Sequence, residues 1–102
     1  MDIAKEIGLP AMLEQTAEEC NELAQACLKL ARKLRNENPT PRTEDEIKES
    51  INEEFADVSL CAGLLSLEGI IDLDKVESIG LAKGERWEKR IEEHKKNKEK
   101  CL

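Results

Sequence analysis

The sequence predicts an all-α fold, in which two long helices form an antiparallel hairpin and a third helix follows. Charged residues make up 38% of the 102 positions, and Phe55 and Trp87 are the only aromatic residues. An interior of Leu, Ile, Val, Ala and Cys suits packed helices better than a sheet. Apolar residues also recur at three- and four-residue steps over long stretches, without strand-like alternation of useful length.

The first long helix is expected to begin at Ala11 and to run up to a loop at residues 36–41. A short helical lead-in over residues 1–10 would end at Gly8 and Leu9-Pro10. The loop holds two prolines and two asparagines, which do not continue a helix. The apolar stripe of this helix combines two sets of residues. One set repeats every seven residues, and the members of the other set lie between them. Its expected members are Leu13, Cys20, Cys27 and Leu34, with Thr16, Leu23 and Leu30 between them.

The second helix is expected over residues 44–67, because Thr43 and Glu46 fit a capping box and Gly69 closes the pattern. Its expected stripe is Ile47, Ile51, Phe55, Val58, Ala62 and Leu65. Asp72 or Asp74 would cap the third helix, and a Lys-rich tail at its end would be solvated and frayed. The stripe of this third helix would be Leu73, Val76, Ile79, Trp87 and Ile91, with Trp87 favoured as a core residue.

Each long helix carries a pair of acids three residues apart, Glu19 with Glu22 and Glu54 with Asp57. Residues at this spacing lie on nearly the same side of a helix, with Cβ atoms about 5–6 Å apart. Both pairs flank their apolar stripe on the same rotational side, and both lie equally far along the chain from the loop. An antiparallel hairpin would therefore bring all four carboxylates together at one level.

Such a cluster repels itself unless a cation neutralises it, and an all-oxygen site selects hard ions. Glu22 has no basic residue at position 25 or 26, and no basic residue lies between Asn52 and Lys75. Local ion pairs therefore do not account for these acids. The pattern predicts a Mg²⁺ site, with Mn²⁺ as a substitute, formed by Glu19, Glu22, Glu54 and Asp57. The alternative reading is that the acids are simply solvated.

At these residues the chain resembles the all-α nucleoside triphosphate pyrophosphatases of the MazG-like superfamily. The resemblance lies in Glu18-Glu19-x-x-Glu22 followed by Glu54-x-x-Asp57, and it covers about residues 11–92 of a single domain over 1–102, with residues 93–102 as the Lys-rich tail. It implies magnesium bound by the motif acids and hydrolysis between the α and β phosphates of a nucleoside triphosphate. It also implies a homodimer or homotetramer assembled as a four-helix-bundle type structure, in agreement with the small core that 102 residues allow.

The resemblance suggests two further roles. Glu18 matches the first motif glutamate and is a candidate for orienting the attacking water. Family members place basic residues on the following helix near the phosphates, and Lys83 and Arg86 are the candidates here, with ordinary surface charge as the alternative.

Related or competing functions are a phosphoribosyl-ATP pyrophosphatase-like enzyme and a non-catalytic helical interaction module. A di-iron bundle is disfavoured because His94 is the only histidine.

Composition limits the partners. A formal net charge of -7 argues against a general nucleic-acid surface. No apolar run reaches the roughly 18 residues that a membrane span needs, so a soluble protein without a membrane anchor is expected. The spacing of Cys20 and Cys27 does not suit zinc. With no apolar signal segment before them, the cysteines are expected to be reduced thiols of a cytoplasmic protein, and Cys20, Cys27 and Cys61 are expected to be buried.

Overall fold

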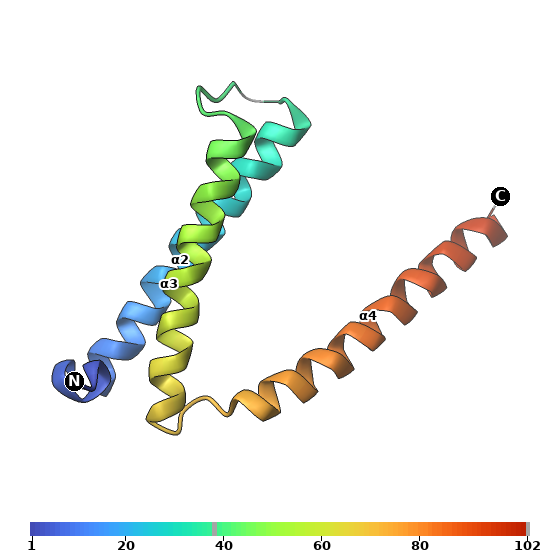
Figure 1. The fold of residues 1–102 in the computed structure, drawn as a ribbon. Helices are drawn as coiled ribbons and strands as arrows, with labels where there is room; N and C mark the ends of the chain where they lie inside the picture. The colour runs from blue at the N-terminus through green and yellow to red at the C-terminus, as the bar shows by residue number, and fades with distance from the viewer. Residues whose placement is uncertain (38, 102) are drawn as a thin grey trace. The chain divides into compact units, whose positions relative to one another are not determined.

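The computed structural model describes residues 1–37 and 39–101, and all its regular elements are helices. The chain divides into two compact units, residues 1–71 and residues 72 onward. The first unit holds α1 (Ile3–Ile7), α2 (Leu9–Arg35) and α3 (Glu44–Leu67), and the second holds α4 (Leu73–Cys101) (Figure 1). The all-α prediction is confirmed for this part of the chain. Asn38 of the predicted loop and Leu102 of the predicted tail lie outside the described residues.

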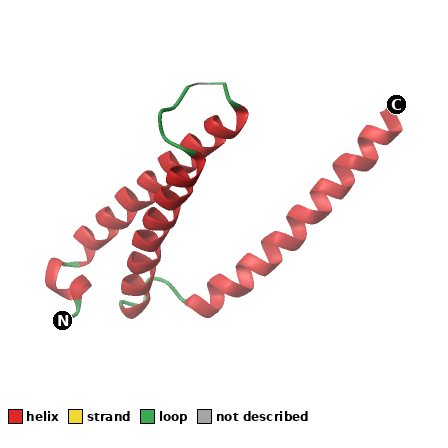
Figure 2. Ribbon diagram, turned by 45° about the horizontal axis from the view of Figure 1, so that its top comes forward, coloured by secondary structure: helices red, strands yellow, loops and turns green. Residues whose placement is uncertain are grey.

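α2 and α3 form the predicted antiparallel hairpin and lie side by side along its length (Figures 1 and 2). α2 ends where Asn36 adopts a left-handed conformation with φ of 55°, and its amide donates to the Lys33 carbonyl. α3 begins with the expected capping box, since Thr43 Oγ1 accepts from the Glu46 amide at 3.1 Å. The end of α2 and the start of α3 therefore follow from local sequence signals.

The main core of this unit lies at the end of the hairpin opposite the loop, where α1 packs on both long helices. Its buried members are Ala4, Met12, Cys61 and Leu65. Gly8 separates α1 from α2 with φ of 91°, a conformation that favours glycine. α2 begins at Leu9, two residues earlier than predicted, because a proline fits the first turn of a helix, where its missing N–H is not needed.

The predicted stripe of α2 is correct for its intermediate set and wrong for its seven-residue set. Thr16, Leu23 and Leu30 are half-buried against α3, as expected. Leu13, Cys20, Cys27 and Leu34 are exposed. The positions that face inward each lie one residue before a member of that set, and they are occupied by Met12, Glu19 and Ala26. α2 carries apolar residues over a broad arc, and a hairpin with one long partner covers only part of it.

The stripe of α3 holds except at one position. Ile47 and Leu65 are buried, while Ile51, Val58 and Ala62 are half-buried. Phe55, however, is 58% exposed. It lies next to Glu54, and Glu54 is the residue that faces α2 at this level.

All four cysteines are free thiols, but only Cys61 is buried. The predicted burial of Cys20 and Cys27 is therefore wrong, because both belong to the arc of α2 that α3 does not cover.

α4 begins at a cap supplied by Asp72, whose Oδ1 accepts from the amides of Asp74 at 3.1 Å and Lys75 at 3.2 Å. The helix continues to Cys101, and its Lys-rich tail is exposed, as expected. Every described residue of α4 is exposed, including Trp87 at 68%. The expected place of Trp87 in a core stays a prediction. Among the described residues, no helix combines the length and the hydropathy that a transmembrane span requires.

Candidate metal centre

The structure brings the four predicted acids together in the middle of the hairpin. Each of them offers a carboxylate oxygen, and these four oxygens all lie within 4.8 Å of one another. α2 supplies two of the side chains, and α3 supplies the other two one turn apart in the same way. The convergence expected from the spacing is thus observed. The contributing residues are Glu19, Glu22, Glu54 and Asp57.

Two of these acids occupy positions where a helical hairpin ordinarily places apolar residues. Glu19 lies on the inward stripe of α2 between Thr16 and Leu23, and Glu54 lies on that of α3. Both are half-buried, and Glu19 Oε2 and Glu54 Oε2 are hidden from solvent without a hydrogen-bond donor among the described residues. Carboxylate oxygens in this situation are costly, because desolvation is not compensated. In the part of the chain that the structure describes, Glu68 Oε1 at the end of α3 is the one further side-chain oxygen with this property.

The carboxylates of the cluster also raise the pKa values of Glu19 and Glu22. For Glu19, the hydrogen bond that Gln15 Nε2 donates to Oε1 at 2.7 Å lowers the pKa, but desolvation and the charges of Glu22 and Asp57 outweigh it and raise the pKa above its usual value. For Glu22, the pKa is raised mainly by interaction with the Glu54 carboxylate, then by desolvation. None of the four acids takes part in an ion pair with another described residue. The centre is therefore an excess of negative charge that a cation would stabilise.

A polar hollow of about 130 Å³ adjoins the acids on the side of the interhelical loop. Ala26 and Ile47 supply apolar walls. Its polar lining contains two of the cluster carboxylates and two cationic side chains. These polar residues are Glu22, Gln25, Lys29, Arg42, Ser50 and Glu54.

A second hollow of about 170 Å³ adjoins the other two acids, Glu19 and Asp57, on the side of α1. Most of its lining is apolar, and Gln15 is its remaining polar residue. The acids thus lie between a hollow with cationic groups and a hollow suited to an uncharged group. The apolar residues that line this second hollow are Ile3, Ile7, Met12, Leu60, Cys61 and Leu64.

Glu18 does not join the cluster. It is exposed on α2, on a different side of the helix from its neighbour Glu19. Its predicted role with the attacking water stays a prediction.

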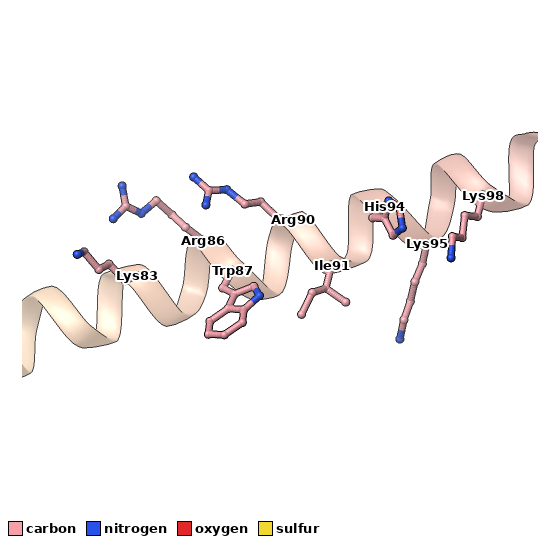
Figure 3. A pocket seen from close by; sticks show the side chains of 8 residues that line it. All are labelled: Lys83, Arg86, Trp87, Arg90, Ile91, His94, Lys95 and Lys98. Carbon is pink, nitrogen blue, oxygen red and sulfur yellow. The ribbon is translucent and has the colours of Figure 1, made fainter. Parts of the chain in front are cut away.

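The two basic residues predicted to contact phosphate lie on α4, in the second unit. Lys83, Arg86 and Arg90 project from one side of that helix, and Trp87 and Ile91 project from an adjacent side (Figure 3). Together with His94 and two further lysines they line a surface hollow along α4. A role for Lys83 and Arg86 at the acidic centre stays a prediction.

Sequence reasoning missed Lys29 and Arg42, which share the polar hollow with the acids. Lys29 lies seven residues after Glu22, and this spacing returns a helix to nearly the same face, so its position contained a usable signal. Arg42 lies outside the helices, and its approach to the centre depends on how the loop returns to α3. Gln15 was missed as well, although its spacing of four from Glu19 favours the observed hydrogen bond.

Comparisons of the chain with protein-family models, curated proteins and solved structures find no match.

Proposed function

We propose that this chain is a magnesium-dependent nucleotide pyrophosphohydrolase of the MazG-like type, which cleaves ribo- or deoxyribonucleoside triphosphates between the α and β phosphates. The observation that carries the proposal is the pair of hidden, unpartnered oxygens, Glu19 Oε2 and Glu54 Oε2, inside a cluster of four acids. A divalent cation bound by oxygen ligands would relieve both the desolvation and the mutual repulsion.

The donor set fits magnesium, since carboxylates are the ligands that hard divalent cations prefer. Manganese would substitute for the same reason. Bound magnesium would polarise phosphate oxygens, offset negative charge and lower the pKa of the attacking water. Its ligands would be Glu19, Glu22, Glu54 and Asp57.

The reaction adds one water molecule across the bond between the α phosphorus and the bridging oxygen. The attacking oxygen stays on the nucleoside monophosphate, and the bridging oxygen leaves with pyrophosphate, with release of a proton. No nucleophilic side chain is needed for this displacement. Glu18 is our candidate for orienting the water, supported by its place in the motif, and Lys83 and Arg86 are candidates for contacting phosphate.

We further propose that the enzyme works as a homodimer or homotetramer in the cytoplasm. Exposed apolar residues support association, because α3 leaves one arc of α2 uncovered, and α4 is the single described helix of its own unit. The four free thiols are compatible with a reducing compartment. Size-exclusion chromatography with light scattering tests the assembly, and a monomer at all concentrations would contradict it.

The activity is tested by measuring pyrophosphate release from a panel of canonical and modified nucleoside triphosphates and phosphoribosyl-ATP, with and without Mg²⁺. We expect metal-dependent release that Glu54→Gln reduces by about 10²-fold or more, since loss of a ligand removes charge stabilisation in the transition state. Glu53→Gln is the matched control, because Glu53 is an exposed neighbour outside the cluster.

Absence of turnover with every substrate would favour a non-catalytic helical interaction module. Turnover confined to phosphoribosyl-ATP would instead reassign the substrate.

A further inference from the structure

The polar hollow beside the acidic centre has two chemically different ends. Glu22 and Glu54 belong to the four-acid cluster, whereas Lys29 and Arg42 bring two positive charges from the loop side. Neither cation forms a described ion pair with a cluster acid. If these cations only neutralised the cluster, direct pairs would be expected. Both side chains line the hollow instead, and Arg42 pairs with Glu46 on α3.

Arg42 is held in place by α3. Its Nη2 donates to the Glu46 carbonyl at 3.1 Å and to Ser50 Oγ at 2.7 Å, and its Nε lies 3.9 Å from Glu46 Oε2. These contacts fix the guanidinium at the level of Ser50, one helical turn before Glu54. Nη1 has no partner among the described residues, so its two N–H groups are available to an anion.

Lys29 reaches the same hollow from α2, two turns beyond Glu22. Its ammonium group forms no ion pair within the described part of the chain. A guanidinium and an ammonium that line one small hollow can each donate a charge-assisted hydrogen bond to one anion. The adjoining carboxylates repel any anion unless a cation lies between them, so a bound anion would have to bridge from a metal ion to the two basic residues.

We propose that Lys29 and Arg42 form the subsite for the terminal phosphates of the substrate, the part that leaves as pyrophosphate. This inference rests on the proposed function and adds the orientation of the bound substrate to it. The phosphate chain extends from the four acids toward the loop, and the uncharged part of the substrate extends toward the apolar hollow beside α1. The loop and α1 lie at opposite ends of the hairpin (Figure 1). The two hollows would therefore hold the substrate in a single orientation along the hairpin.

The test uses inorganic pyrophosphate as the probe, titrated calorimetrically into the full chain with Mn²⁺ present. Lys29→Gln and Arg42→Gln should each weaken pyrophosphate binding by about tenfold or more, because each removes a charged hydrogen bond. Lys48→Gln is the matched control, since Lys48 lies on α3, pairs with Glu44 at 3.1 Å and does not line the hollow. Binding of Mn²⁺ alone should be retained in all three variants.

Wild-type affinity for pyrophosphate in both hollow variants would overturn the inference, as would a wild-type chain that binds no pyrophosphate with or without metal. Because Arg42 also contacts α3, thermal unfolding of Arg42→Gln must first show a folded protein, and Lys29→Gln provides the second, exposed site.

Kinetics separate this inference from the proposed function. If nucleotides are hydrolysed and only Lys83→Gln and Arg86→Gln raise KM, the subsite is wrong and the function stands. If pyrophosphate binding requires Lys29 and Arg42 but no nucleotide is hydrolysed, the subsite stands and the function fails.

Discussion

In the unit of residues 1–71, side chains from three helices bury one another, whereas in α4 every described residue is exposed. The charges differ too. Residues 1–71 contain 15 acidic and 7 basic residues, a net charge of -8, and residues 72–102 contain 8 acidic and 9 basic residues, a net charge of +1. The contrast shows that an apolar stripe is not a core by itself. Burial depends on a second element that covers the stripe.

The comparison predicts, first, that truncation of a buried hairpin residue has the largest effect on stability. Ile47→Ala should reduce the free energy of unfolding by about 2–5 kcal/mol, because Ile47 is 1% exposed and its removal leaves a cavity. Urea denaturation followed by circular dichroism measures this. A loss below about 1 kcal/mol would show that the hairpin interface is loosely packed.

A second effect is expected at the acidic centre of the hairpin, which Glu19, Glu22, Glu54 and Asp57 form. Mg²⁺ or Mn²⁺ at about 100 times its dissociation constant should stabilise the wild type by about 2.7 kcal/mol, by preferential binding to the folded state. Glu54→Gln should abolish most of this gain, while Glu53→Gln should keep it. Thermal unfolding with and without metal provides the measurement, and equal metal stabilisation in both variants would contradict the assigned ligands.

A third, smaller effect is expected at the start of α3. Thr43→Ala removes the side chain that accepts from the Glu46 amide and should cost about 1 kcal/mol. Thr43→Ser retains the hydroxyl and is the matched control. Chemical denaturation of the two variants distinguishes a capping effect from a general sensitivity of the loop.

The fourth prediction concerns pH in the absence of metal. Because the folded state raises the pKa values of Glu19 and Glu22 above the ordinary 4.5, it binds protons more tightly than the unfolded state. Their contribution to stability is therefore fully present below pH 4.5 and is lost as pH rises through the raised folded-state values. The difference in melting temperature between the wild type and Glu22→Gln should vary across this range. A difference independent of pH would contradict the shift.

The smallest effect is expected on α4. At concentrations where the chain is monomeric, Trp87→Ala should change the free energy of unfolding by less than about 0.5 kcal/mol, since Trp87 is 68% exposed. Repeating the measurement at increasing protein concentration sharpens the comparison. A loss that grows with concentration would show that association between copies covers α4, and a large loss in the monomer would show that the chain itself covers it.

Local signals in the sequence determined most of the secondary structure. The Thr43–Glu46 capping box set the start of α3, and Asn36 in its left-handed conformation set the end of α2. The period of the two acidic pairs, together with their equal distance from the loop, predicted that four carboxylates meet. These features depend on contacts a few residues apart or on the simple geometry of an antiparallel hairpin, so they are readable from the chain.

Only the tertiary structure decided which side of α2 faces α3. Leu13 and Cys20 are as apolar as the residues that pack inward, yet Met12 and Glu19 occupy the inward positions. It also showed that Glu19 and Glu54 are hidden from solvent and that Arg42 reaches along α3 to Ser50. The physical reason is that a helix with a broad apolar arc has several favourable rotations, and the choice among them depends on the summed packing of its neighbours.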